Sequence, residues 1–96
     1  MIERSGNRLV VSAPMTIANA RALSDKFTAF AQEGEVVVDL AQVREADSAS
    51  LALLFDWVRA QQARGGSLRV ENAPRGVMAL AAMYDVADLI ALSPAA

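Results

Sequence analysis

The β-branched run Val36–Leu40 constrains the fold of this chain more than any other feature of its sequence. Three consecutive valines are typical of a central strand that is buried on both faces of a sheet. Shortly after it, the polar cluster Asp47–Ser50 leads into the apolar segment Leu51–Phe55, which favours a helix start. We therefore predict that this loop joins the central strand to a helix, and that any active or docking point lies there.

Strand and helix signals alternate along the rest of the chain. Glycine and proline mark most of the boundaries, because both residues interrupt regular structure. Before the central strand, the sequence predicts a hairpin of Ile2–Glu3 and Leu9–Val11 around a turn at Ser5–Asn7, and then a helix capped by Thr16 or Asn19 and stopped by Gly34. After the central strand, it predicts a helix ended by Gly65–Gly66, a strand at Ser67–Glu71 and a helix from Pro74 to Tyr84. The last piece, Val86–Leu92, is predicted to be either an edge strand or an irregular tail.

This order of elements predicts a single α/β domain over residues 1–96. Strands that alternate with helices form mainly parallel sheets with right-handed crossovers, and the leading hairpin adds an antiparallel edge. We expect a mixed, mainly parallel sheet of four or five strands together with three helices.

Composition excludes several classes of function. The chain has 96 residues, of which 54% are hydrophobic, and contains neither cysteine nor histidine. It therefore suits one compact core and cannot build a disulfide framework, a thiolate or imidazole metal site, or a histidine-based catalytic relay. The net charge of -2 comes without any basic stripe, which argues against a nucleic-acid surface. We expect a protein without enzymatic activity, metal or cofactor.

The chain also lacks the sequence signals of membrane insertion. Its first segment, Met1–Ser12, has no apolar core of signal-peptide length. No apolar run approaches the roughly 20 residues that span a bilayer. We expect a soluble cytoplasmic domain that does not itself insert into a membrane.

The second predicted helix carries apolar residues on two opposite sides. Its expected core stripe consists of Leu51, Leu54, Phe55 and Val58. The opposite side, which should be polar, presents Leu53 and the only tryptophan of the chain, Trp57. Either the third helix or the chain end covers Trp57, or Trp57 is an exposed anchor for a partner, because tryptophan is enriched among interface hot spots. Met78 and Ala82, on the non-core side of the third helix, favour the second alternative.

Ser48 has two interpretations as well. In the first, Asp47 or Ser48 caps the second helix and has a structural role only. In the second, Ser48 presents a hydroxyl at the positive end of the helix, where it accepts a phosphoryl group or contacts a partner. Catalysis by Ser48 itself is not expected, because the chain has no histidine and its nearest lysine in sequence is Lys26.

The segments Val37–Leu40 and Asp47–Leu54, with a short spacer between them, resemble the signature of STAS domains. In that signature a buried strand ending in Asp-Leu precedes an Asp-Ser/Thr-x-Gly-Leu helix start. Pro14–Ala20 resembles the start of the family's first helix, and Gly66–Val70 resembles its following strand, so the resemblance covers nearly the whole chain. Ser50 departs from the pattern, because it stands where the family usually has glycine. A serine at this position either changes how a partner binds to the loop or acts as a helix-start residue.

Within the family, the segments Leu51–Leu54 and Leu80–Val86 are most similar to the MlaB group. These are small cytoplasmic STAS subunits of an ABC transporter that moves phospholipid between the membranes of Gram-negative bacteria. The resemblance implies a non-catalytic subunit that packs against the ATPase subunit and supports it, with Ser48 at the contact and no homo-oligomer outside the complex. Together with the helical projection, it predicts the partner-binding residues Asp47, Ser48, Ala49, Ser50, Leu53, Trp57, Met78 and Ala82.

The same family offers an alternative function. In anti-anti-sigma factors the matching serine is phosphorylated by an anti-sigma kinase, and the added charge ends binding, so the resemblance also makes Ser48 a candidate phosphorylation site. The apolar outer stripe favours a more permanent interface than such a switch needs. A third alternative, a small enzyme or nucleotide-binding domain, is disfavoured because the chain has no glycine-rich phosphate loop.

Overall fold

The computed structural model describes residues 1–86 and 89–94 of the chain. Strands and helices follow one another in the order that the sequence predicts, with one further strand at the end. The elements are β1 (Ile2–Ser5), β2 (Arg8–Val11), α1 (Ala20–Thr28), β3 (Glu35–Asp39), α2 (Ala49–Ala63), β4 (Ser67–Ala73), α3 (Arg75–Met83) and β5 (Leu92–Pro94).

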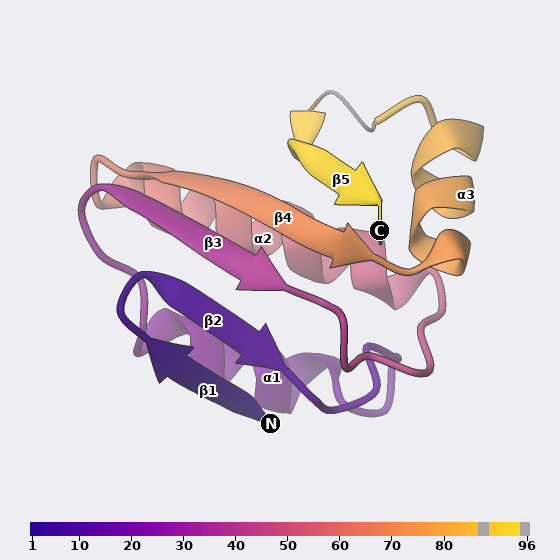
Figure 1. Cartoon of the computed structure of the whole chain (residues 1–96), viewed down its shortest axis with the longest axis horizontal. Helices are drawn as coiled ribbons and strands as arrows, with labels where there is room; N and C mark the ends of the chain where they lie inside the picture. The colour runs from indigo at the N-terminus through magenta and orange to yellow at the C-terminus, as the bar shows by residue number, and fades with distance from the viewer. Residues whose placement is uncertain (87–88, 95–96) are drawn as a thin grey trace.

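The five strands form one sheet in the order β1-β2-β3-β4-β5 (Figure 1). Strand β1 pairs antiparallel with β2, and all the other neighbouring strands are parallel. The prediction of a mixed, mainly parallel α/β sheet with three helices is therefore confirmed. The last predicted piece, Val86–Leu92, contains residues 87 and 88, which lie outside the described residues, and the strand at the end of the chain begins only at Leu92.

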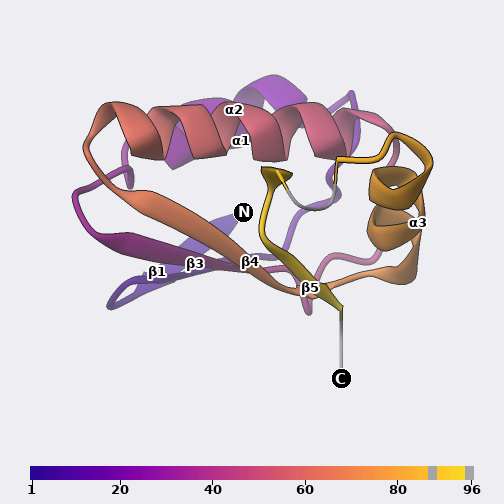
Figure 2. The same cartoon turned by 90° about the horizontal axis from the view of Figure 1, so that it is seen from above.

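Helices α1 and α2 lie together on one face of the sheet, while α3 stands at the end near β4 and β5 (Figure 2). Leu9, Val38 and Val70 align across the three central strands and point into this layer, with at most 2% of each residue exposed. Side chains alternate between the two faces of a strand, so every second residue of these strands faces the other way. The core therefore lies between the sheet and the helix pair.

The other face of the sheet carries a ladder of ion pairs. Arg8 on β2 donates to Asp39 at 3.0 Å and to Glu71 at 2.7 Å. Arg69 on β4 donates to Glu71 at 2.8 Å and lies 3.4 Å from a carboxylate oxygen of Glu35. The ladder joins β2, β3 and β4 without covering the apolar core.

Helix α1 ends at Thr28, earlier than the stop at Gly34 that the sequence predicts. The N–H groups of Ala29 and Phe30 donate three residues back along the chain, to the carbonyls of Lys26 and Phe27, and this tighter pattern ends the helix. Phe30 therefore lies beyond the helix, where it is half-buried against the core.

Gln61, in the last turn of α2, is hydrogen-bonded to the segment that follows α1. Its side chain is fully buried, and its Oε1 accepts a hydrogen bond from the N–H of Gln32 at 3.1 Å. Its Nε2 donates to the carbonyl oxygens of Gln32 at 2.5 Å and Gly34 at 2.9 Å. Gly66 packs against this contact so closely that a Cβ there would collide with the Gly34 carbonyl oxygen. One amide thus ties the α1–β3 loop to the end of α2.

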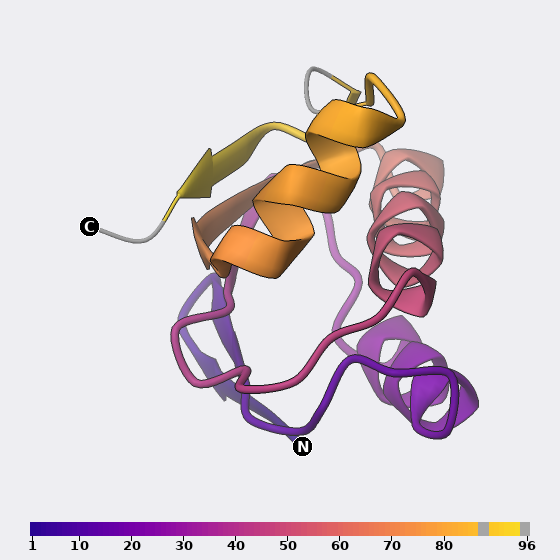
Figure 3. The ribbon, with the colours of Figure 1, turned by 90° about the vertical axis from the view of Figure 1, so that its right-hand side faces the viewer.

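Helix α2 lies between α1 and α3, so both of its flanks are covered (Figure 3). Trp57 is only 1% exposed and stacks on Phe27 of α1, with ring centroids 4.9 Å apart and an angle of 10° between the rings. The interpretation of Trp57 as an exposed anchor is therefore wrong. The alternative, that the chain itself covers this residue, is right, but the covering element is α1 and not α3 or the chain end. A helix that contacts both a sheet and a neighbouring helix needs apolar residues on two sides.

Within residues 1–86 and 89–94, no helix is both long enough and apolar enough to cross a bilayer.

Candidate functional site

Two loops that follow neighbouring strands are joined by hydrogen bonds at the start of α2. The N–H of Met15, in the loop after β2, donates to the carbonyl oxygen of Glu45 at 2.9 Å. The N–H of Asp47 donates back to the carbonyl oxygen of Met15 at 3.2 Å. Met15 and Ala46 thus form a short parallel bridge beyond the ends of the strands. This edge of a parallel sheet is where binding sites commonly form in α/β folds.

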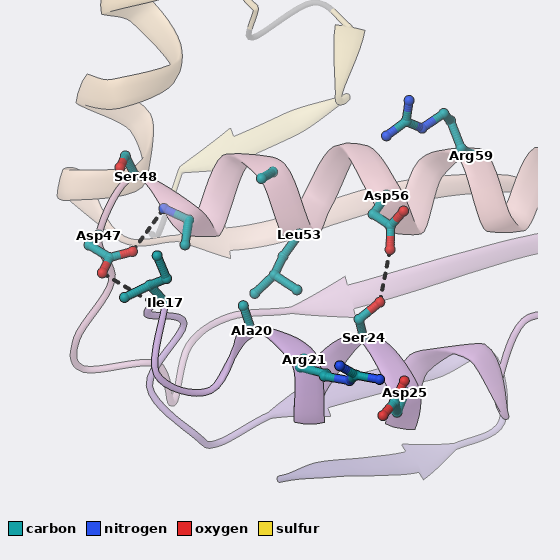
Figure 4. Close-up of a pocket in the computed structure, with 12 residues that line it drawn as sticks. Ile17, Ala20, Arg21, Ser24, Asp25, Asp47, Ser48, Leu53, Asp56 and Arg59 are labelled. Carbon is teal, nitrogen blue, oxygen red and sulfur yellow. Dashed lines mark hydrogen bonds between the residues drawn. The ribbon is translucent and has the colours of Figure 1, made fainter.

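The carboxylate of Asp47 connects the two loops to the helix (Figure 4). Its Oδ1 accepts from the N–H of Ala49, the first helical residue, at 2.8 Å, and its Oδ2 accepts from the N–H of Ile17 at 3.1 Å. Asp47 is therefore the residue whose side chain satisfies the helix start, a role that the sequence left open between Asp47 and Ser48. By holding Ile17, the same carboxylate also sets the position of the loop before α1.

Ser48 is exposed, and its hydroxyl makes no capping hydrogen bond to the start of α2. It stands at the N-terminus of a 15-residue helix, where the helix dipole favours negative charge and hydrogen-bond acceptors. Both carboxylate oxygens of the neighbouring Asp47 accept backbone N–H groups. The site can offer a hydroxyl for a contact or for modification.

A groove of about 960 Å³ runs from Ser48 along the junction of α1 and α2. Its apolar lining comes from small side chains and from Leu53, which is only 4% exposed. Ile17 stands at its edge with 80% of the residue exposed, a large value for an isoleucine. The residues around the groove are Ile17, Ala20, Arg21, Ser24, Asp25, Asp47, Ser48, Ala49, Ala52, Leu53, Asp56 and Arg59.

Of the predicted partner-binding residues, the structure brings four together at the groove: Asp47, Ser48, Ala49 and Leu53. Sequence reasoning missed Ile17, because an apolar residue in a loop carries no periodic signal. Its position becomes meaningful only through the hydrogen bond to Asp47, 30 residues later in the chain. On α3, Ala82 is exposed and Met78 is half-buried, outside the groove.

Ser50 is fully buried, so its hydroxyl is not available for a contact with a partner. Within the described part of the chain, its Oγ has no hydrogen-bond partner, and the same holds for the Nε1 of Trp57. A buried hydroxyl without a partner costs free energy, typically about 1 to 3 kcal/mol. The prediction that Ser50 belongs to the contact surface is therefore wrong for its side chain, because the residue faces the core.

Among residues 1–86 and 89–94, no three acidic side chains lie close enough together to hold a metal ion. Two carboxylates of the groove, Asp47 and Asp56, accept hydrogen bonds from within the chain.

The family model described as "Mlab, STAS domain" matches residues 1–92. This chain belongs to the MlaB-type STAS family. The match covers nearly the whole domain, including the strand β3, the loop to Ser48 and all three helices. A search of characterised protein sequences finds no significant match.

Solved structures share the STAS fold at low sequence identity. A candidate anti-sigma factor antagonist from Thermotoga maritima matches with a TM-score of 0.73 and 14% identity, over 96% of this chain and 83% of that one. The murine anion transporter Slc26a9 matches with a TM-score of 0.75 and 14% identity over 93% of this chain, which corresponds to 16% of the transporter. The structure of Mglu matches with a TM-score of 0.57 and 28% identity, over 78% of this chain and 20% of Mglu. The first two likenesses show the fold alone.

Proposed function

We propose that this MlaB-type STAS domain is a non-catalytic subunit that binds and supports the ATPase of a phospholipid-transporting ABC complex, which maintains the lipid asymmetry of the outer membrane. The observation that carries the proposal is the free hydroxyl of Ser48 beside the apolar groove between α1 and α2. The family match over residues 1–92 supports the choice of partner.

The groove suits a protein partner. Ile17 exposes most of its side chain, and covering a residue of this type contributes about 2 kcal/mol to association. The Ser48 hydroxyl adds a hydrogen bond that orients the partner, and the small side chains around it allow close approach. Met78 and Ala82 on α3, on the other flank of α2, remain candidates for a second contact with the same partner.

The proposed role requires no chemistry from this chain. ATP hydrolysis belongs to the partner, and the STAS subunit acts by stabilising the assembly. It works on the cytoplasmic side of the inner membrane, held there by the transporter and not by insertion into lipid. Nucleic acid is not a proposed partner. The purified domain is expected to show no ATP turnover above a control without protein, and turnover that survives further purification would contradict the non-enzymatic role.

An affinity pull-down from native membranes tests the proposal, with the domain as bait and mass spectrometry to identify what it retains. We expect an ABC-type ATPase together with its permease. The Ser48→Asp bait should lose both, because a carboxylate at the contact would be desolvated. A matched control, Ser5→Asp, places the same charge on the exposed strand β1 and should retain them.

An anti-anti-sigma factor is the second candidate function. The fold likeness to the candidate anti-sigma factor antagonist and the exposed Ser48 hydroxyl favour it. Recovery of a serine kinase or a sigma-factor regulator in the pull-down, with transfer of phosphate from ATP to Ser48, would establish this function in place of the transporter role.

A further inference from the structure

Ile17 is the most exposed large apolar residue within residues 1–86 and 89–94, with 80% of its surface accessible. It lies in the turn before α1, next to Asp47 and at the same groove as Ser48 (Figure 4). Single apolar residues are common on protein surfaces, so exposure alone does not make Ile17 a binding residue. Ile17 differs from such residues because hydrogen bonds hold the backbone on both sides of it.

The loop that carries Ile17 is tied to itself and to the neighbouring loop. The side chain of Asn19 donates to the carbonyl oxygen of Pro14 at 3.0 Å, and its N–H donates to the carbonyl oxygen of Thr16 at 3.0 Å. Met15 is fully buried, and its backbone is bridged to the loop before α2. The loop therefore presents the exposed side chain from a backbone that is fixed before and after it.

Asp47 holds Ile17 itself. Its Oδ2 accepts the Ile17 N–H at 3.1 Å, while its Oδ1 accepts the Ala49 N–H at 2.8 Å. One carboxylate thus fixes Ile17 relative to the start of α2, and so relative to the exposed Ser48. Because isoleucine is branched at Cβ and has few side-chain rotamers, little conformational entropy is lost when a partner covers it.

The high exposure of Ile17 also indicates the shape of the surface that would cover it. A flat partner would cover only the tip of a side chain that projects this far, whereas burying it requires partner atoms on several sides. We propose that Ile17 is the apolar anchor of the ATPase contact and inserts into an apolar recess of that subunit. Asp47 is the positioning residue that fixes this anchor beside Ser48. This inference rests on the proposed function and adds to it the group that the partner recognises and the residue that places it.

The affinity of the purified ATPase subunit for variants at position 17 tests the anchor. Ile17→Ala should weaken binding about tenfold, because it removes most of the apolar surface that the recess would cover. Ile17→Asp should weaken binding at least about a hundredfold, because a charge would enter the recess. Leu89→Ala is the control, since Leu89 is 66% exposed and outside the groove, and it should leave affinity within about twofold.

A double-mutant cycle tests the positioning role. Asp47→Ala releases the Ile17 N–H, so the loop has to be ordered on binding and affinity should fall about fivefold. In the Ile17→Ala background the same change should weaken binding by less than about twofold, because the side chain that Asp47 positions is absent. In the Ser48→Ala background it should still weaken binding about fivefold, because the route through Ile17 is intact.

Two further variants separate positioning from a general loss of stability. Gln61→Ala removes hydrogen bonds at the other end of α2 and, where circular dichroism shows it to be folded, should leave affinity within about twofold. Asp47→Asn can keep one of the two bonds and replaces Asp47→Ala in the cycle if the alanine variant does not fold.

The outcomes separate this inference from the proposed function. Equal affinity of Ile17→Ala and the unaltered chain for the ATPase would overturn the anchor and leave the subunit role intact. An equal effect of Asp47→Ala with and without Ile17 would overturn the positioning role. A dimer in sedimentation that Ile17→Ala breaks would show that the recess belongs to a second copy of this chain. Failure of the unaltered chain to bind the ATPase would overturn both the inference and the proposed function.

Discussion

Polar side chains at the two ends of helix α2 differ in their burial and in their hydrogen bonding. At the C-terminal end, Gln61 is buried and its amide makes three hydrogen bonds to the loop after α1. At the N-terminal end, Ser48 is exposed and its hydroxyl makes no capping bond, because Asp47 already satisfies the helix start. A polar group whose bonds are all made within the chain holds the fold together. A polar group left free at a fixed position is available to a partner.

Because different residues are expected to determine stability and binding, single substitutions can test the two properties separately. Changes at residues that are tied within the chain should lower the free energy of unfolding. Changes at Ser48 should lower affinity and leave stability nearly unaltered.

The largest loss of stability is expected at Gln61. Gln61→Ala removes three hydrogen bonds and leaves the N–H of half-buried Gln32 without its Gln61 acceptor, while the Gly34 carbonyl oxygen keeps its bond from the Ser67 N–H, which should cost about 3 kcal/mol of unfolding free energy in all. Urea denaturation followed by circular dichroism measures this cost. Gln62→Ala, at the exposed neighbouring position, is the control and should change stability by less than about 0.5 kcal/mol. Equal effects of the two substitutions would mean that the Gln61 contact is weak in solution.

A smaller loss is expected at Asp47, which is only half-buried. Asp47→Ala removes the acceptor for the N–H groups of Ile17 and Ala49 and should cost about 2 kcal/mol. Asp47→Asn can keep one of the two bonds and should cost about half as much. Hydrogen exchange at the Ile17 N–H should accelerate in both variants, and unchanged exchange would show that Asp47 does not hold that loop.

Ser50 sharpens the comparison, because it is buried and yet has no hydrogen-bond partner within the described residues. Ser50→Ala should raise the free energy of unfolding by about 1 kcal/mol. Ser50→Gly should be close to neutral, because glycine inside a helix costs about 1 kcal/mol and offsets that gain. A clear loss of stability in Ser50→Ala would mean that the hydroxyl finds a partner in solution.

The ion-pair ladder on the open face of the sheet is expected to have the smallest effect, because exposed ion pairs contribute little. Burial alone would raise the pKa of Asp39, but hydrogen bonds from Asn72 and the Ala41 N–H, with the charge of Arg8, hold that pKa below its ordinary value. The hydrogen bond from Arg8 lowers the pKa of Glu71, partial burial opposes it, and the charges of Arg8 and Arg69 add to the lowering.

A lowered pKa in the folded state fixes the direction of the pH dependence. Such a carboxylate adds stability above its unfolded pKa, near 4, and that stability is lost as the pH falls through the folded pKa. Between about pH 5 and about pH 3, unfolding free energy should therefore fall less steeply for Asp39→Asn than for the unaltered chain. Glu3→Gln, at an exposed position on β1, is the control and should follow the unaltered chain. Identical slopes for all three would mean that the ladder does not stabilise the fold.

Much of the fold is readable from local sequence. The valine run at β3, the Ser5–Asn7 turn and Gly65–Gly66 predict strand, hairpin and helix end correctly, because each depends on residues close together in the chain. The position of Trp57 is not readable in this way, because a helical projection shows which side of a helix is apolar and not which element covers that side. Only the packing of Phe27 in α1 settles it.

Other contacts in the fold and at the site are not revealed by any local pattern. From the sequence, Gln61 is an ordinary glutamine near a helix end, and only the structure shows that it is hydrogen-bonded to Gln32 in the loop after α1. Ile17 gains its position from Asp47 across 30 residues of sequence. The resemblance to STAS domains implies a contact at Ser48, which stays a prediction, and only the hydrogen bonds show that Asp47 and not Ser48 satisfies the helix start.

The most direct measurement is the affinity of the purified ATPase subunit for Ser48→Asp, with the free energy of unfolding determined on the same samples. We expect Ser48→Asp to bind at least about tenfold more weakly, with unfolding free energy equal to or slightly above that of the unaltered chain, because a carboxylate is favourable at a helix N-terminus. Ser5→Asp should change neither quantity. Unchanged affinity for Ser48→Asp would contradict the assignment of Ser48 to the contact.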